Sequence, residues 1–179
     1  TSGGVSTTAA DIGRQESTGG EPMSVRYRGR DVLGLPPNSQ SIVALLALGI
    51  LEGHDLAPMS EATRLHHQIE ALRLGFEFAI DEVGEPTDAM LGKVQAALSA
   101  EGLAARRKRI TDHATAPVRV GGGNSADTTY LCTIDQEGNA VSLMMSICGG
   151  FGAGLVAGDT GVILNNRASQ FSTRHGHPN

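Results

Sequence analysis

Hydrophobic and polar positions follow two different rhythms along this chain of 179 residues. Between Pro58 and Gly84, apolar residues recur at steps of three and four, which places them on one face of a helix. The residues of this expected face are Leu65, Ile69, Leu72, Phe76 and Ala79. From about residue 128 the pattern changes to stretches rich in Thr, Val, Ile, Leu and Met, which favour strands. The sequence therefore predicts an α+β protein, with helices in the first part and antiparallel β-structure in the second.

Turn and capping residues set the expected bounds of the other elements. A hairpin is expected over residues 23–35, closed by a turn at Arg28-Gly29. Three further helices are expected: one from Asn38 or Ser39 to Leu51, one from Thr87 or Asp88 to Leu98, and a short one ending in the basic cluster at 106–109. We interpret this cluster as a solvated helix end, because the neighbouring sequence supplies no partner for its charges.

In the β part, residues 128–135 and 140–147 form one expected hairpin, and residues 155–157 and 162–164 form another pair of strands. A two-residue turn at Glu137-Gly138 would place Thr128 opposite roughly Ile147. Its neighbours on the partner strand would then be Ser146 and Cys148. A slip of one residue would change which of these two side chains shares a face with Thr128. The pattern thus brings hydroxyl groups and a thiol together at the start of the hairpin.

Composition excludes several classes of function. The chain has 14 basic and 19 acidic residues, a net charge of −5, and only six aromatic residues, so it is not expected to bind nucleic acid. Its longest apolar run, from Ile42 to Leu51, is about half a membrane span, and no targeting peptide opens the chain. The two cysteines match no zinc motif, and the expected pairing keeps Cys132 and Cys148 apart. We expect no membrane span, no metal and no cofactor.

Several short motifs follow one another in the second half of the chain. Residues 128–142 read Thr-Thr-Tyr-Leu-Cys-Thr-Ile-Asp-Gln-Glu-Gly-Asn-Ala-Val-Ser. They are followed by Phe-Gly-Ala-Gly at 151–154, Gly-Val-Ile-Leu-Asn-Asn at 161–166, and Phe-Ser at 171–172. In order and spacing this set resembles the start of the small subunit in the γ-glutamyltranspeptidase family.

The part before residue 128 looks like the end of the large subunit of that family. The similar features are Gly3-Gly4-Val5, the hairpin between Pro22 and Pro37, Ile50-Leu51-Glu52 and the helix at 60–80. We therefore expect residues 1–127 to be the C-terminal part of a large-subunit-like region, with a glycine-rich linker at 121–127. Residues 128–179 would be the start of a small-subunit-like β region. On this comparison the chain is about a third of a complete family member.

The resemblance implies the four-layer αββα fold of the N-terminal-nucleophile hydrolases, of which this chain would form a part. Members of the family cut themselves before a threonine, which here is Thr128, so the expected cleavage site is the Asp127-Thr128 bond. The freed α-amine of Thr128 then serves as the base for its own hydroxyl. Ser146 stands where the family keeps a hydroxyl that supports the nucleophile. The implied activity is that of a hydrolase or acyltransferase acting on amides, in a family associated with glutathione metabolism.

Three positions of the implied acyl pocket depart from the family pattern. Cys148 stands where an asparagine is usual, Arg167 replaces a glutamine or glutamate, and Gln170 replaces an aspartate. The last two positions normally receive the α-ammonium of the substrate, which an arginine repels, since it prefers carboxylate or phosphate. We therefore expect an amide with an anionic or neutral acyl group, although Arg167 could also be a solvent-facing residue in a shifted loop. Tyr130, in place of histidine, is a milder change.

Other interpretations stay open at this point. The chain could be a degenerate family member, or an excerpt that serves as an assembly or binding scaffold. The resemblance also implies partners, namely a small amide or peptide substrate and the remaining segments of both subunits. The oxyanion hole belongs to a later Gly-Gly motif in the family, so this stretch alone should be inactive. Family members are often exported, but the sequence leaves the compartment undecided.

Weaker candidates for chemistry are also present. Cys148 could be a nucleophile, but no histidine is assigned to it, so a buried, inert thiol is the better interpretation. His66 and Glu70 lie one helical turn apart and are expected to form a surface pair. The His-x-His sequence at 175–177 is expected to belong to a frayed terminus.

Overall fold

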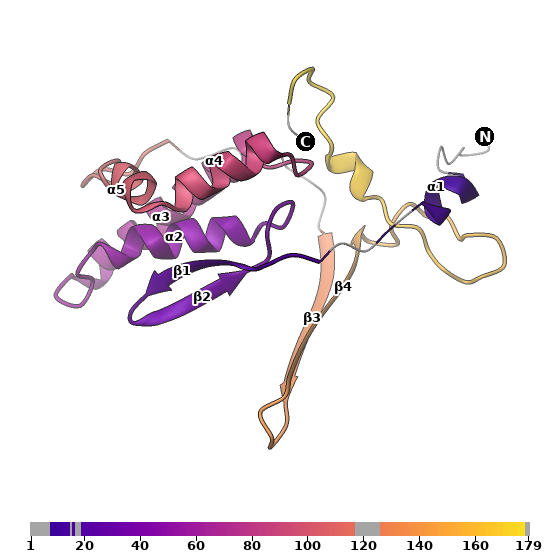
Figure 1. The fold of residues 1–179 in the computed structure, drawn as a ribbon, viewed down its shortest axis with the longest axis horizontal. Helices are drawn as coiled ribbons and strands as arrows, with labels where there is room; N and C mark the ends of the chain where they lie inside the picture. Colours follow the sequence, from indigo (N-terminus) through magenta and orange to yellow (C-terminus); the bar gives the residue numbers. More distant parts are fainter. Residues whose placement is uncertain (1–7, 15, 17–18, 117–125, 178–179) are drawn as a thin grey trace.

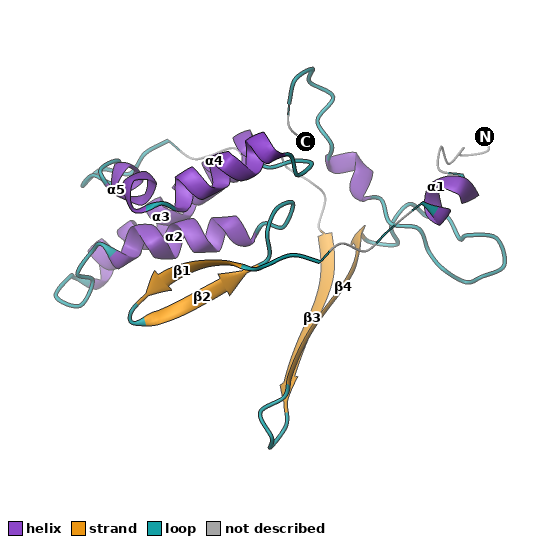
Figure 2. Cartoon of the chain, in the orientation of Figure 1, coloured by secondary structure: helices purple, strands orange, loops and turns teal. Residues whose placement is uncertain are grey.

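The computed structural model describes residues 8–14, 16, 19–116 and 126–177. Two hairpins and a group of helices make up this part of the chain (Figures 1 and 2). In chain order the elements are α1 (Ala9–Gly13), β1 (Met23–Tyr27), β2 (Arg30–Gly34), α2 (Ser41–Glu52), α3 (Glu61–Glu82), α4 (Asp88–Leu98), α5 (Ala100–Arg107), β3 (Ala126–Ile134), β4 (Ala140–Gly149) and the 3-10 helix η1 (Arg167–Gln170). The predicted α+β class is confirmed. Within the described residues the strands form two separate two-stranded sheets, so the four-layer arrangement stays an expectation.

The first hairpin forms where its turn residues predict it. Arg28 and Gly29 both have positive φ angles, 48° and 78°, which is the geometry that joins two antiparallel strands through a two-residue loop. Val25 of β1 pairs with Val32 of β2, and Val25 is buried. The hairpin contributes this side chain to the core beside α2.

Helix α2 is the centre of the core. Its largest side chains are fully buried because it is covered by the β1–β2 hairpin, by α3 and by the shorter helices α4 and α5. The buried residues of α2 are Ile42, Val43, Leu45, Leu46, Ala47, Gly49, Ile50 and Leu51. A helix that is apolar on nearly all sides is stable only when it is surrounded in this way.

Short polar side chains begin the helices, as the sequence predicts. Thr87 accepts a hydrogen bond from the Met90 amide at the start of α4. The expectation for α2 is wrong by one residue, since its N-cap is Gln40 and not Asn38 or Ser39. The Ser39 hydroxyl still accepts a hydrogen bond from the amide of the first helical residue, 3.2 Å away.

The buried face of α3 differs from the predicted one. Ser60 caps this helix as expected, but Leu65, Ile69 and Leu72 are 53%, 54% and 43% exposed. The face that packs against the core consists of Glu70, Ala71, Leu74, Gly75 and Phe78. Apolar residues occupy both sides of α3, and its small residues allow the closer approach to α2. Of the predicted face, Phe76 and Ala79 are partly buried and pack against the core. The periodicity therefore identifies the helix correctly, but it places the centre of the buried side wrongly.

The basic cluster at the end of α5 makes tertiary contacts, so its interpretation as a solvated helix end is wrong. Arg107 donates hydrogen bonds to the carbonyls of Ile50 and Gly49 at the end of α2. Arg109 binds both carboxylate oxygens of Glu77 in α3, at 2.8 and 2.9 Å. These partners lie between 32 and 58 residues away in sequence, which is why the local pattern does not reveal them.

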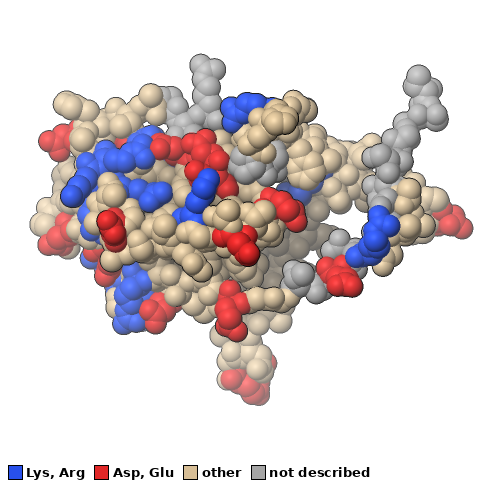
Figure 3. Space-filling view, turned by 45° about the horizontal axis from the view of Figure 1, so that its top comes forward, with Lys and Arg blue, Asp and Glu red and all other residues tan. Residues whose placement is uncertain are grey.

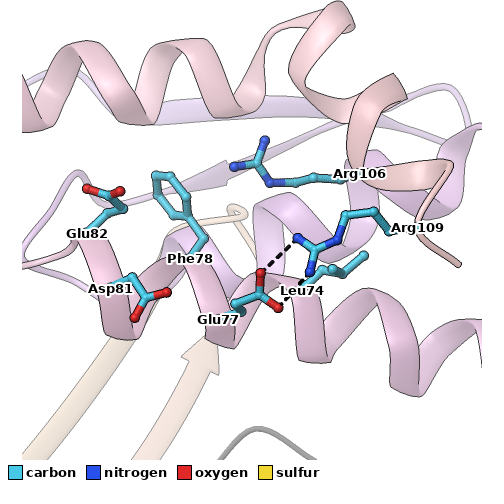
Figure 4. Close-up of a pocket in the computed structure, with 7 residues that line it drawn as sticks. All are labelled: Leu74, Glu77, Phe78, Asp81, Glu82, Arg106 and Arg109. Atoms are coloured by element: carbon cyan, nitrogen blue, oxygen red, sulfur yellow. Dashed lines mark hydrogen bonds and ion pairs between the residues drawn. The ribbon is translucent and has the colours of Figure 1, made fainter. Parts of the chain in front are cut away.

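The ion pair between Arg109 and Glu77 borders a pocket of about 160 Å³ on the surface of α3 and of the end of α5 (Figure 4). Arg106 lies over the ring of Phe78, and three acidic side chains line the other side. Acidic and basic side chains both cover this side of the helical part and lie next to one another there (Figure 3). No residue of β3 or β4 lines this pocket, so the pocket is separate from the site described below.

Two further features concern the described residues as a whole. None of their helices has the length and apolar character needed to cross a membrane. Nor do their His, Cys, Asp and Glu side chains come together in a group of three or more that could hold a metal ion.

Candidate active site

The β3–β4 hairpin places Thr128 directly opposite Ser146. The expected register, with Thr128 opposite Ile147, is wrong by one residue. The reason is the loop: Asp135 still pairs with Asn139 through a backbone hydrogen bond, so three residues and not two form the turn. The last of them, Gly138, has φ +87°, the left-handed conformation that closes a three-residue hairpin loop.

The regular pairing of the hairpin is interrupted at the expected cleavage site. Ala126 pairs with Gly149, whereas Thr128 pairs with Ser146, so β4 has one more residue than β3 in this interval. Such a bulge bends the strand and redirects its side chains. The bond between residues 127 and 128 therefore lies where the ladder changes register. The glycine-rich linker is expected at 121–127, and its residues 121–125 and the side chain of Asp127 lie outside the described residues.

Ser146 is the point where the site residues meet. The Thr128 hydroxyl donates a hydrogen bond to Ser146 Oγ at 3.0 Å. The Arg167 guanidinium donates another through Nη2, also at 3.0 Å, and the Cys148 amide donates a third at 3.1 Å. Ser146 is half-buried, and Thr128 and Arg167 are exposed. The nucleophile candidate is thus held by a hydroxyl that a cation also contacts.

Cys148 lies within the bulge and has an unusual backbone conformation. Its φ angle is +77°, which L-residues with a side chain rarely adopt, and its side chain is 4% exposed. The Gln170 amide donates a hydrogen bond to its sulfur at 3.3 Å. Cys132 pairs with Ser142 in the ladder, and both cysteines are free thiols. A buried thiol with an amide as its contact supports the interpretation that Cys148 is not a nucleophile.

The segment after β4 folds back and brings η1 to the hairpin. Three backbone hydrogen bonds and one isolated antiparallel bridge, Val156 to Ile163, join its two arms. The residues expected to pair therefore do pair, but through a single bridge and not as two regular strands. Asn166 fastens the segment to the end of β4. Its side-chain oxygen accepts a hydrogen bond from the backbone amide of Gly149 at 2.8 Å, and its backbone amide donates one to the Ile147 carbonyl.

Asn166 is therefore a positioning residue that our sequence reasoning did not assign. It stands directly before Arg167, and its two hydrogen bonds hold η1 in reach of Ser146 and Cys148. The Asn-Asn motif at 165–166 was the available signal, because a side chain that mimics a backbone partner is needed where a strand ladder ends.

The structure brings together all five of the predicted catalytic and substrate-binding residues. They are Thr128, Ser146, Cys148, Arg167 and Gln170. None of them is acidic, and no carboxylate of the described residues forms an ion pair with Arg167. The cluster therefore carries one positive charge.

The other candidate group, His66 and Glu70, is not the surface pair that the sequence suggests. Glu70 is 3% exposed and accepts hydrogen bonds from Arg73 and from Thr115. His66 instead contacts the Thr111 carbonyl, 2.6 Å away. Both residues attach the chain that follows α5 to α3.

A comparison with protein-family models finds a match over the whole chain. The model described as gamma-glutamyltranspeptidase covers residues 1–179. The chain belongs to the gamma-glutamyltranspeptidase family. This agrees with the ordered motifs that follow residue 128.

Curated relatives are proenzymes of hydrolases. The glutathione hydrolase-like YwrD proenzyme of Bacillus subtilis is 36% identical over 163 residues, which cover 88% of this chain and 30% of the relative. The oxamate amidohydrolase proenzyme of Klebsiella pneumoniae is 29% identical, covering 94% and 32%. The glutathione hydrolase proenzyme of Escherichia coli is 27% identical, covering 96% and 31%. The chain thus spans about a third of the length of these relatives.

Proposed function

We propose that this chain carries the cleavage site and the nucleophile of a self-processing enzyme that hydrolyses amides or transfers their acyl groups. The observation that carries the proposal is the hydrogen bond from the Thr128 hydroxyl to Ser146, at a bulge beside the Asp127-Thr128 bond. Processing would divide the region at this bond, with residues 1–127 in one subunit and 128–179 in the other.

Processing needs no group from outside the protein other than water. Thr128 Oγ attacks the carbonyl carbon of Asp127, the C–N bond breaks, and the hydroxyl proton passes to the departing nitrogen. The product is an ester between Asp127 and the Thr128 side chain. Water then hydrolyses this ester, which leaves a carboxylate on Asp127 and a free α-amine and hydroxyl on Thr128. The bend in the strand at the bulge favours the attack, because it exposes the bond to its own side chain.

After processing, Thr128 holds a nucleophile and a base in one residue. Its α-amine takes the proton as Oγ attacks a substrate amide, and the leaving amine then receives that proton. The acyl group is left as an ester on Thr128. Water hydrolyses the ester, or a second amine accepts the acyl group. Ser146 orients the Thr128 oxygen in both half-reactions, and the five residues of the site face the acyl group.

The names of the relatives support this reaction class. They describe proenzymes of a glutathione hydrolase, an oxamate amidohydrolase and, in Pseudomonas, an acylase that is 34% identical over 87% of this chain. The bonds cleaved by the first two are amides, although the acyl groups differ. We accordingly propose that this chain is part of a γ-glutamyltranspeptidase-like hydrolase or acyltransferase. The residues of its own pocket determine which acyl group the substrate carries.

The proposed partners are the remaining segments of the two subunits. Both faces of the β3–β4 hairpin expose large apolar side chains, which a hairpin standing alone in water would not favour. They include Tyr130, Leu131, Ile134, Val141, Leu143, Met144 and Met145. We propose that further strands and helices of the family's four-layer αββα fold cover these faces and supply the oxyanion hole.

Denaturing electrophoresis and N-terminal sequencing of the complete gene product test the proposal. The expected result is two fragments, the smaller beginning Thr-Thr-Tyr-Leu. Thr128→Ala should abolish cleavage, Thr128→Ser should preserve it, and Thr129→Ala is the matched control that should still be cleaved. A wild-type protein that stays intact after long incubation would refute the proposal and favour an assembly or binding scaffold.

A further inference from the structure

Arg167 brings a positive charge next to the nucleophile without a described carboxylate to neutralise it. Its guanidinium donates to Ser146 Oγ, and the described residues hold no ion pair to it. The side chain is exposed, so four of its five N–H groups are available to a ligand. A guanidinium of this kind is suited to hold a carboxylate with two parallel hydrogen bonds.

The position of this charge limits the length of the acyl group. Arg167 Nη2 and Thr128 Oγ1 each lie 3.0 Å from the same Ser146 oxygen, so one atom separates the cation from the nucleophile. An acyl group with its carbonyl carbon at Thr128 and its carboxylate at Arg167 needs to bridge only a few ångströms. One or two carbon atoms between the two groups satisfy this distance, and a longer chain has to fold back.

The rest of the pocket does not favour a cationic substituent. Gln170 uses its amide to contact the thiol of Cys148, and Ser146 and Cys148 are uncharged. The described part of the site thus offers no carboxylate to receive an ammonium group. An α-ammonium on the acyl group would instead meet the guanidinium of Arg167, and like charges at this distance repel each other.

We propose that the site takes amides of short dicarboxylic acids, in which a carboxylate lies one or two carbons from the scissile carbonyl and no α-ammonium is present. Arg167 is the residue that determines this specificity, by binding the carboxylate while Thr128 attacks the amide. The inference rests on the proposed function, because it needs Thr128 as nucleophile. It adds to that function the class of acyl group.

A series of 4-nitroanilides tests the inference, since each substrate releases the same coloured amine. The oxalyl, malonyl, succinyl and glutaryl derivatives vary the distance of the carboxylate, and the acetyl and propionyl derivatives lack it. Glutaryl and γ-glutamyl derivatives differ only in the α-ammonium. In the complete, processed gene product, kcat/KM should be highest for the malonyl or succinyl compound, and glutaryl should exceed γ-glutamyl.

Three variants separate specificity from structure. Arg167→Gln should lower the ratio of kcat/KM for the malonyl and propionyl derivatives by about tenfold or more, because a charge-assisted pair is lost. Arg167→Lys should retain part of this ratio. Arg174→Gln changes an exposed arginine of the same segment that contacts none of the site residues, and it should leave the ratio unchanged.

Failure of the inference differs from failure of the proposed function. If the protein is cleaved before Thr128 but prefers γ-glutamyl over glutaryl compounds, the inference is wrong and the nucleophile stands. The inference is also wrong if Arg167→Gln slows malonyl and propionyl substrates equally, since Arg167 would then act only through Ser146. Absence of cleavage and of turnover on every anilide would overturn the proposed function itself.

Discussion

The hydroxyl of Thr128 and the hydroxyl of Ser146 face each other across the β3–β4 hairpin, with their oxygens 3.0 Å apart. Both residues are fixed by strand pairing on the regular side of the bulge, so the contact belongs to the backbone geometry and does not depend on a flexible loop. A nucleophile held in this way keeps one rotamer, which reduces the entropy lost on reaching the transition state.

Replacing Ser146 should therefore slow the reactions of Thr128 without abolishing them. For Ser146→Ala, loss of one hydrogen bond of about 1 kcal/mol predicts rates roughly fivefold lower for processing and for hydrolysis. Ser146→Thr restores the hydroxyl and should recover most of the rate. Time courses of cleavage measure the effect. Equal rates for all three proteins would show that Ser146 has no part in positioning Thr128.

Replacing the buried carboxylate of α3 should destabilise the helical part. Glu70 accepts from the Thr115 amide, the Thr115 hydroxyl and Arg73, so every group that faces it is a donor. Glu70→Gln directs an NH2 group at one of these donors and should lower the free energy of unfolding by about 1–3 kcal/mol. Glu85→Gln, on an exposed residue, is the control. Urea unfolding measures both, and equal midpoints would contradict the prediction.

The same carboxylate predicts a loss of stability in acid. Burial alone would raise the pKa of Glu70, but hydrogen bonds from Thr115 and the charge of Arg73 outweigh it and lower the pKa. Hence the unfolded chain binds the proton first, and the stabilisation present above about pH 4.3 is lost as the pH falls through the folded pKa. Thermal unfolding at a series of pH values should show that the midpoint of Glu70→Gln decreases less in acid than that of the wild type. An equal decrease in both proteins would refute this prediction.

A second pH effect is expected from His54. Burial, together with the positive charges of His67 and Arg107, lowers its pKa. The buried Nε2 atom has no hydrogen-bond partner in the described structure. Below about pH 6.5 the unfolded state takes up a proton that the folded state does not yet bind. The free energy of unfolding therefore decreases as the pH is lowered, until the pKa of His54 in the folded state is reached.

His54→Gln removes this effect and should flatten the stability profile just below neutral pH. His175→Gln, which changes an exposed histidine near the end of the described chain, should leave the profile as in the wild type. Unfolding midpoints measured between about pH 5 and 7 distinguish the two variants. A profile that is equally steep for His54→Gln would contradict the assignment.

Glycine at position 75 sets the distance between α2 and α3. A Cβ atom there would lie 2.7 Å from the Val43 carbonyl oxygen, and backbone at that place cannot move aside. Gly75→Ala should therefore cost about 1–3 kcal/mol of stability. Gly92→Ala in α4 meets no atom within 4 Å and should stabilise the protein by about 0.5–1 kcal/mol, because alanine favours the helix. If urea unfolding showed that both variants change the free energy of unfolding in the same direction, the argument would be refuted.

Part of the candidate site could be predicted before the fold was known. The ordered motifs after residue 128 indicate the family, and five site residues follow from that resemblance. The register is different: it depends on one extra residue in the turn and on a bulge that no sequence pattern marks. Asn166, which holds η1 against β4, was missed because its importance lies in two backbone groups it contacts from a distance.

The features that the sequence determines by itself are those that depend on interactions between residues close together in the chain. The Arg28-Gly29 turn, the caps at Ser60 and Thr87, and the α+β order depend on residues within a few positions of each other. Tertiary structure decided which side of α3 is buried and that the basic cluster has partners. It also decided that Arg167 reaches Ser146. Each of these needs a group far along the chain, and a local pattern contains no information about the distance between such groups in space.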